Sequence, residues 1–330
     1  MPIDPEAAAI DGTRRALDVP CLPLARYRLD FRARDHITLP PLQGAVWRSA
    51  FGLALKTMSD EAAAHGTSAL GLYEYMFETP RPPSAAKLGG SNAAPHPFVI
   101  GAEPNFEPRS FVPGDMLTIE LTLIGRGNDH APAVLEAFAR AGAGGLAKSR
   151  GRAELAEVTG IWRSAAPDTP LARGADGRFA PAPSESPPIP PMPDIAEVHL
   201  LTPLRLVRDR RPIKPREFVP ADLLRALLRR ISMLMTFHTD ADLETDFHGL
   251  TALAHQVRMA GADLAMAAQK RYSRNHGDTI DMDGLVGGFL LDMRGAAPFW
   301  PYLWLGQWVH AGKGTVLGNG ALHVREAVDF

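Results

Sequence analysis

Between Arg26 and Arg34, apolar side chains alternate with charged ones, which is the two-residue period of a half-buried strand. Its inward positions are expected to be Tyr27, Leu29, Phe31 and Ala33. A helix is predicted from about Leu42 to Met58, followed by a strand at 117–124 and a short helix at 131–141. The expected apolar side of the long helix carries Leu42, Val46, Ala50 and Ala54.

The second half of the chain repeats this order of elements. A strand at 198–207 leads to a strong helix at 220–237, further helix follows, and the chain ends on a strand with Leu322 and Val324 inward. The buried side of the strong helix is expected to hold Leu224, Leu227, Leu228, Ile231 and Met235. The two halves predict an α+β protein made of two divergent copies of one unit, each an antiparallel sheet with helices on one face.

Each half also carries a glycine-rich loop before its last strand. The first holds Lys148 and Arg150, and the second, at 310–320, holds Lys313 and Thr315. Because glycine lacks a Cβ, such a loop lets a ligand approach backbone N–H groups, and with a lysine it is a natural phosphate cradle. The order of residues differs from that of a P-loop, and a strand follows instead of a helix. The alternative is a tight turn before an edge strand.

A proline-rich stretch at 180–193 separates the two halves. Proline fixes φ and removes an N–H donor, so this stretch is expected to be an extended linker and not a core element. The first eighteen residues lack regular patterning. We therefore expect an N-terminal tail at 1–18, a first domain at 19–160, a linker at 161–195 and a second domain at 196–330.

Composition agrees with two modest domains. The 330 residues are 45% hydrophobic, and the single cysteine, Cys21, excludes an internal disulfide and a cysteine-rich zinc site and suits the cytoplasm. No apolar stretch approaches the length of a membrane span, and no signal-peptide pattern opens the chain. The net charge of -2 argues mildly against a nucleic-acid-binding protein, but the distribution of the basic residues does not.

Basic residues gather in several short segments. Five arginines and a lysine lie between Arg205 and Arg216, opposed only by Asp209, and Lys270, Arg271 and Arg274 surround Tyr272. For each cluster alone, the commoner explanation is a solvated charged face. Several such clusters beside two glycine-rich loops favour an anionic polymer as the partner, and arginine or tyrosine can also stack on bases.

Several short motifs follow one another in an order that resembles a known family. They are Leu39–Arg48 (LPPLQGAVWR), Leu72–Pro80 (LYEYMFETP), Ile124–Gly125, Arg229–Ser232 (RRIS), Arg271–Ser273 (RYS) and His310–Gly320 (HAGKGTVLGNG). Over residues 20–325 this layout resembles the CRISPR-associated endoribonucleases that process repeat RNA, which are members of the RAMP superfamily (the CRISPR-associated protein six family). One departure is Asn319, where such loops often carry an aromatic residue.

The resemblance implies a fold and an activity. The fold is two tandem ferredoxin-like (RRM-like) domains, and the activity is metal-independent cleavage of CRISPR repeat RNA in precursor crRNA, without a cofactor. The 2′-hydroxyl attacks the adjacent phosphate, which leaves a cyclic phosphate and a 5′-hydroxyl. Histidine suits the proton transfers because its pKa lies near neutrality, and cations or N–H groups suit the developing charge. The resemblance also implies that the protein stays bound to the product crRNA and joins other subunits of a CRISPR effector complex.

Four residues are candidates for the catalytic steps. His310 opens the C-terminal loop, His65 follows the first helix, and His36 lies in the loop after the first strand. The alternatives are a structural role at the turn for His310 and a surface loop position for His36. Some relatives pair a histidine near the position of His65 with a lysine, but the corresponding residue here is Gly71. Tyr272 completes the set.

The candidate RNA-binding residues are basic side chains together with the C-terminal glycine loop. They are Arg48, Lys56, Lys148, Arg150, Arg210, Arg211, Arg225, Arg229, Arg271, Gly312, Lys313, Gly314, Thr315, Gly318 and Gly320. No metal site is expected, because His248 and His255 share a helical face without an acidic ligand at suitable spacing.

Two other hypotheses remain open. A catalytically silent RNA-binding subunit would use the same fold and the same loops, and the near-neutral charge and Gly71 favour it. A nucleotide-binding enzyme that uses Lys313 on a small phosphate is the third hypothesis, although a duplicated RNA-binding layout would be unnecessary for it.

Overall fold

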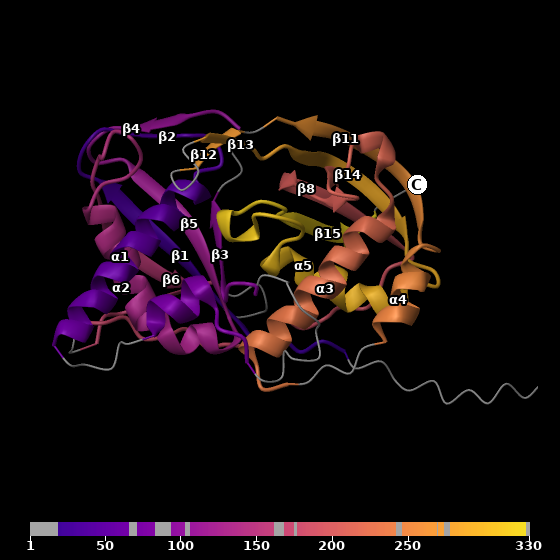
Figure 1. The fold of residues 1–330 in the computed structure, drawn as a ribbon, viewed down its shortest axis with the longest axis horizontal. Helices are drawn as coiled ribbons and strands as arrows, with labels where there is room; N and C mark the ends of the chain where they lie inside the picture. The colour runs from indigo at the N-terminus through magenta and orange to yellow at the C-terminus, as the bar shows by residue number, and fades with distance from the viewer. Residues whose placement is uncertain are drawn as a thin grey trace, which may run out of the picture.

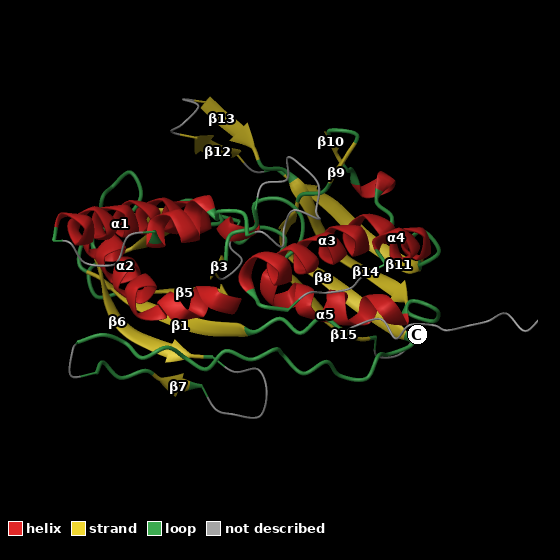
Figure 2. Cartoon of the chain, turned by 60° about the horizontal axis from the view of Figure 1, so that its bottom comes forward, coloured by secondary structure: helices red, strands yellow, loops and turns green. Residues whose placement is uncertain are grey.

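The computed structural model describes residues 19–65, 71–82, 94–102, 106–161, 168–174, 177–241, 246–268, 270–273 and 278–327, so the predicted tail at 1–18 lies outside the described residues. Two α+β domains lie side by side along the long axis of the molecule (Figure 1). In each domain, helices cover one face of a sheet (Figure 2). No helix in the described part of the chain is long and apolar enough to cross a membrane.

The first domain has the strand order of a ferredoxin-like fold. Its elements are β1 (Leu24–Ala33), β2 (Ile37–Leu39), α1 (Gly44–Ala64), η1 (Glu74–Glu78), β3 (Phe98–Ala102), β4 (Arg109–Phe111), β5 (Met116–Ile124), η3 (Gly125–His130), α2 (Ala131–Ala143), β6 (Ala153–Gly160) and β7 (Thr169–Pro170). The antiparallel sheet runs β3-β5-β1-β6-β7, and β2 pairs with β4 apart from it. Because α1 connects β1 to β3 and α2 connects β5 to β6, both helices lie on the same face of the sheet.

The second domain repeats this arrangement. Its elements are β8 (Ile195–Leu204), β9 (Val207–Arg208), β10 (Arg211–Pro212), η4 (Pro215–Glu217), α3 (Pro220–His238), α4 (Phe247–Ala254), β11 (Arg258–Ala267), β12 (Lys270–Ser273), β13 (Asp278–Asp281), β14 (Gly284–Asp292), η5 (Ala297–Phe299), α5 (Trp300–Val309), η6 (Thr315–Leu317) and β15 (Leu322–Glu326). Its antiparallel sheet runs β11-β14-β8-β15. This is the strand order of the first domain, with β11, β14, β8 and β15 in the places of β3, β5, β1 and β6. The predicted fold of two tandem ferredoxin-like domains is confirmed.

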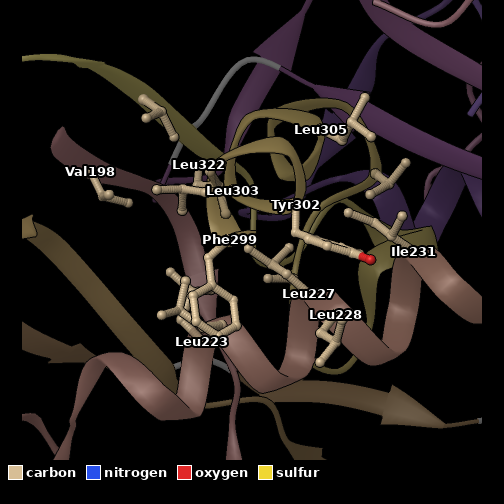
Figure 3. Close-up of a cluster of buried hydrophobic side chains, with 14 of the residues drawn as sticks. Val198, Leu223, Leu227, Leu228, Ile231, Phe299, Tyr302, Leu303, Leu305 and Leu322 are labelled. Carbon is tan, nitrogen blue, oxygen red and sulfur yellow. The ribbon is translucent and has the colours of Figure 1, made fainter. Parts of the chain in front are cut away.

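Strand and helix patterns read from the sequence account for both cores. The inward positions of β1 are buried, and its register places Tyr27 opposite Leu121 and Phe31 opposite Leu117 on β5. In the second domain, α3 and α5 fill the space over β8 and β15 (Figure 3). The side chains that meet there include Val198, Leu223, Leu227, Leu228, Ile231, Phe299, Tyr302, Leu303, Leu305 and Leu322.

The buried side of α1 differs from the prediction by one residue. The fully buried positions are Gly44, Trp47, Phe51 and Leu55, and the predicted stripe at Val46, Ala50 and Ala54 is only partly buried. Aromatic rings decide the orientation of the helix. Phe51 stacks on Phe138 of α2 with ring centroids 4.5 Å apart, and Trp47 lies 4.5 Å from Phe31 of β1. Large rings bury far more apolar area than alanine, so the helix turns them toward the sheet.

The prediction of continued helix after α3 is wrong for residues 258–292. Helix continues in α4, before this segment, and returns in α5 after it, whereas β11 to β14 between them are strands. The segment Arg258–Ala267 is rich in alanine and methionine, which favour helix. Pairing with β14, in which Leu264 lies opposite Gly287 and Met266 opposite Leu285, overrides that preference because the partner strand satisfies the backbone donors and acceptors.

The proline-rich segment is extended, but it is not separate from the cores. Ala182 in this segment, and Phe179 just before it, are buried in the first domain, so the expectation that the stretch 180–193 holds no core residue is wrong at Ala182. Farther on, the indole N–H groups of Trp300 and Trp304 donate to the carbonyl oxygens of Pro190 (2.7 Å) and Pro188 (3.0 Å). The segment is therefore attached to both domains, and the exact domain boundaries remain a prediction.

Glycines allow the two domains to approach closely. A Cβ added to Gly44 of α1 would lie 2.1 Å from the carbonyl oxygen of Leu317. One added to Gly318 (φ 87°) would lie 2.8 Å from the carbonyl oxygen of Ile100 on β3. A Cβ and a non-bonded carbonyl oxygen cannot approach each other so closely. The C-terminal glycine loop is therefore pressed against the first domain, and its glycines serve packing between the domains.

Tyr27→Phe tests the attachment of the proline-rich segment to the first domain. The buried Tyr27 hydroxyl donates to Asn128 Oδ1 and accepts the N–H of Ala182 at 3.0 Å. Its removal leaves two buried polar groups unpaired, so we expect urea unfolding to show a loss of about 1–3 kcal/mol. Tyr73→Phe is the control, because among the described residues no hydrogen bond of its hydroxyl is recorded, and it should cost little. Equal stability of wild type and Tyr27→Phe would contradict this account.

Candidate functional site

The C-terminal glycine loop uses most of its backbone N–H donors in hydrogen bonds to its own carbonyl oxygens and to the chain at the end of β8. The N–H of Ala311 donates to the oxygen of Gly320 (3.0 Å), that of Lys313 to Arg205 (2.9 Å) and that of Gly320 to Pro203 (3.0 Å). These bonds fix the loop to the end of β8. Because most of its amide N–H groups are already paired, the loop supports other groups and offers few free donors to a phosphate.

Within this loop, only Lys313 is exposed among the predicted RNA-binding residues. Gly312 and Gly314 are half-buried, and Thr315, Gly318 and Gly320 are buried. The ammonium group of Lys313 is therefore the part of the loop that a phosphate can reach from solvent. The loop glycines shape the backbone that presents it.

His310 is buried at the end of α5. Its exposed fraction is 8%, and its backbone takes φ 60°, which ends the helix. Burial, together with the nearby charge of Arg230, lowers the pKa of the imidazole to about 3. The ring is therefore neutral at pH 7, and protonating it in place is costly. A buried, neutral imidazole that is hard to protonate is poorly suited to act as a general acid.

His36 lies in a different environment. It is exposed, in the turn between β1 and β2, and its backbone touches the first glycine loop, since a Cβ on Gly151 would lie 2.3 Å from its carbonyl oxygen. That loop is closed by the N–H of Leu146 donating to Gly151 (2.8 Å) and exposes Lys148 and Arg150 at its tip. The structure thus brings an exposed histidine to the base of a loop with two exposed cations.

Arg48 and Lys56, two predicted RNA-binding residues of α1, each lie beside an aromatic ring. The guanidinium of Arg48 lies 5.0 Å from the ring centroid of Phe77, and the ammonium of Lys56 lies 5.4 Å from that of Tyr73. Gly52, between them on the helix, leaves room for Phe77. Arg48 is half-buried and Lys56 exposed, so of these two side chains only Lys56 is fully open to solvent.

The other candidates lie on separate elements. His65 caps α1, where its ring Nδ1 lies 2.7 Å from the carbonyl oxygen of Glu61 and the side chain is exposed. Arg225 and Arg229 are exposed on α3. Within the described part of the chain, no contact joins His36, His65 and His310, so the three histidines do not form one site.

Two hairpins project from the second domain on the same side (Figure 2). The turn between β9 and β10 exposes Arg210, next to Arg211. The strands β12 and β13 form the other hairpin and place Arg271 and Tyr272 in β12. The exposed residues Arg210, Arg211 and Lys313 form a basic rim on the second domain, because the backbone of Lys313 is bonded to Arg205 just before β9.

Pattern reasoning missed a polar contact between the domains. The Tyr75 hydroxyl of η1 lies 3.1 Å from His238 Nδ1, and His238 Nε2 lies 2.7 Å from the carbonyl oxygen of Pro95. Burial lowers the pKa of His238 to about 4, so Nε2 donates to Pro95 and Nδ1 accepts from the tyrosine. Nothing in the spacing of these residues indicated the contact, because they are far apart in the chain.

Protein-family models match both halves of the chain. A family model described as an N-terminal domain matches residues 22–184. The model of the CRISPR-associated endoribonuclease Cas6 matches residues 198–322. No curated protein matches the sequence.

Solved structures share the two-domain fold. A Cas6 of Thermus thermophilus in a product complex has 17% sequence identity and a TM-score of 0.55, with 92% of this chain and 99% of that chain covered. A partial Cas6-RT-Cas1–Cas2 complex has 11% identity and a TM-score of 0.51, with 93% of this chain and 46% of that chain covered. At these identities the likeness extends to the fold. Through the match of residues 198–322 to the endoribonuclease model, the second ferredoxin-like domain of this chain is assigned to the Cas6 family of CRISPR-associated proteins.

Proposed function

We propose that this protein is an endoribonuclease that cleaves CRISPR repeat RNA in precursor transcripts. The observation that carries the proposal is the match of residues 198–322 to the Cas6 endoribonuclease. That match spans the domain with the exposed Lys313 and the two basic hairpins. A structural relative is in a product complex, which supports RNA as the ligand of this fold.

The proposed reaction needs no metal ion. The 2′-oxygen attacks the neighbouring phosphorus while its proton passes to a base. The bond from phosphorus to the 5′-oxygen then breaks, and an acid protonates the departing oxygen. The products are a 2′,3′-cyclic phosphate and a 5′-hydroxyl. The protein supplies proton transfer and charge stabilisation, the roles that histidine and lysine or arginine side chains fill well.

We assign one proton transfer to His36. It is exposed, so its ring can reach a substrate and exchange protons with it. Lys148 and Arg150, exposed at the tip of the neighbouring glycine loop, supply positive charge for the phosphate in the transition state. His310, His65 and Tyr272 stay as rival candidates in the same assay, and burial disfavours His310.

RNA binding is assigned to exposed cations on both domains. The basic rim of the second domain and the tip of the first glycine loop can contact the phosphates of a hairpin and its flank, which A-form RNA presents more readily than its bases. Arg225 and Arg229 on α3 and Lys56 on α1 extend the exposed positive charge. The buried loop residues Thr315, Gly318 and Gly320 support this surface from beneath.

A catalytically silent RNA-binding subunit is the second candidate function. The burial of His310, which leaves the C-terminal loop without an accessible histidine, favours it, as does Gly71 in place of a lysine. A structural relative occurs in a complex with Cas1 and Cas2, so either function is compatible with assembly into a larger CRISPR complex after binding crRNA.

Cleavage in excess EDTA separates the two candidates. Purified protein incubated with RNA of the CRISPR repeat encoded near its own gene should give a fragment ending in a cyclic phosphate, because the attacking group belongs to the RNA itself. Analysis of the product ends by mass spectrometry reads this out. Intact but tightly bound RNA would instead support the silent subunit, and cleavage only with magnesium would exclude the metal-free reaction.

His36→Ala tests the assignment of the proton transfer. Loss of one general acid or base should slow single-turnover cleavage by roughly a hundred- to ten-thousandfold while RNA affinity barely changes. His248→Ala is the control, because His248 is an exposed histidine on α4 with no assigned role. Normal cleavage by His36→Ala, with loss of cleavage in His310→Ala or His65→Ala, would move the active centre to the other residue.

Lys313→Gln tests the contact between the C-terminal loop and RNA. We expect weaker binding and a salt dependence of the affinity that is flatter by about one phosphate contact, since one cation no longer displaces counterions. Lys313→Arg keeps the charge and should keep the slope. An unchanged slope for Lys313→Gln in filter-binding titrations across a salt series would show that RNA passes elsewhere.

A further inference from the structure

The turn that carries His36 is bonded to the residue that follows the first glycine loop. The antiparallel ladder between β1 and β6 stops just before Arg34, but the contact between the two chain segments continues beyond it. The carbonyl oxygen of Arg152 accepts the N–H groups of Arg34 (2.8 Å) and Asp35 (3.3 Å). The backbone just before His36 is therefore held to the end of the loop.

The side chains of Asp35 and Arg152 close the same junction. Oδ2 of Asp35 accepts the backbone N–H of Arg152 at 3.0 Å and its Nε–H at 2.7 Å, and Oδ1 accepts from Nη2 at 3.2 Å. A bidentate contact between a guanidinium and a carboxylate fixes the orientation of both groups, which a lysine ammonium does not. The side-chain hydrogen bonds, followed by the backbone one, lower the pKa of Asp35 to about 2, so the pair is charged at neutral pH.

The loop on which His36 lies has a constrained backbone. Gly151 allows the close approach, because a Cβ there would lie 2.3 Å from the carbonyl oxygen of His36. Earlier in the loop, Ala147 (φ 55°) and Arg150 (φ 51°) take the left-handed conformation that residues with a side chain rarely adopt. Such conformations persist where the surrounding contacts over-determine them. The junction at Arg152 is one of these contacts, and it sets how the His36 turn meets the loop.

Stability does not account for the pair of Asp35 and Arg152. The exposed fraction of the Arg152 side chain is 64% and that of the Asp35 side chain is 38%. Exposed ion pairs contribute little to the free energy of unfolding, because water and salt screen them. Their hydrogen bonds restrict geometry instead. Proton transfer is sensitive to geometry, since a displacement of about 1 Å can slow a reaction on the order of a hundredfold.

We propose that Arg152 and Asp35 are positioning residues for His36. The proposal rests on the proton transfer that the proposed function assigns to this histidine. The Arg152 guanidinium is paired with Asp35, and it acts by holding the turn against the first glycine loop. The imidazole and the exposed cations of the loop, Lys148 and Arg150, are thereby directed at the same phosphate.

Single-turnover cleavage of repeat RNA by the full chain tests the positioning role. Arg152→Gln removes the bidentate contact, so we expect the rate to fall roughly ten- to a hundredfold while the Kd for RNA and the Tm stay unchanged. Arg152→Lys keeps the charge without the bidentate geometry and should restore only part of the rate. Arg34→Gln is the matched control, because the exposed Arg34 side chain pairs with Glu154 instead, and it should cleave normally.

Asp35→Ala breaks the same pair from the other side. It should slow cleavage to a similar extent, and it keeps the proposal testable if Arg152→Gln fails to fold. A direct contact of Arg152 with RNA would behave differently. Arg152→Gln would then weaken RNA binding, Arg152→Lys would restore the full rate, and Asp35→Ala would cleave normally. That set of results would overturn the positioning role.

A double-mutant cycle with His36→Ala shows whether Arg152 acts through the histidine. If it does, Arg152→Gln causes little further slowing in the His36→Ala background, because the group that it positions is gone. Additive effects, or normal cleavage by Arg152→Gln when His36→Ala is slow, would overturn the positioning role and leave the proposed function intact. Normal cleavage by His36→Ala, or RNA left intact by the wild type, would instead overturn the assignment on which the proposal rests.

Discussion

Close contact between the C-terminal glycine loop and the first domain is the constraint on which the arrangement of the molecule depends. Gly44 admits the backbone of Leu317, and Gly318 admits that of Ile100, at separations that leave no room for a Cβ. The loop itself is bonded to the end of β8. One short segment therefore belongs to the second domain by hydrogen bonds and to the first by packing, and it sets how the two sheets lie relative to each other.

This position explains why the loop contributes so little accessible chemistry. A segment that fills the space between two domains must bury its residues, and His310 and Asn319 are buried with it. Only Lys313 extends outward. At the tip of the first glycine loop, no part of the described chain covers Lys148 and Arg150, which stay exposed beside His36. The same sequence feature thus serves packing in one domain and presents charge in the other.

Buried polar groups at the interface between the two domains show the energetic cost of joining two cores. Tyr75 and His238 satisfy each other across the interface at 3.1 Å, and Pro95 accepts the remaining imidazole donor. Among the described residues, the hydrogen-bond partner of the Arg230 guanidinium is the carbonyl oxygen of Val309. A satisfied pair stabilises the interface, whereas burying a charge without a counter-charge costs stability.

The sequence by itself determined the order of strands and helices, because burial on one face imposes a period of two or of 3.6 residues that is visible in the letters. It predicted β1, β5, α2, α3 and β15 well, and the duplicated layout led to the correct fold and family. Tertiary structure decided the rest. Pairing with β14 made a strand of an alanine-rich segment, and ring stacking turned α1 by one residue. His310 is buried and His36 exposed because the C-terminal glycine loop, and not the first one, meets the other domain. The sequence could not show this, because local periodicity carries no information about contacts between segments that are far apart in the chain.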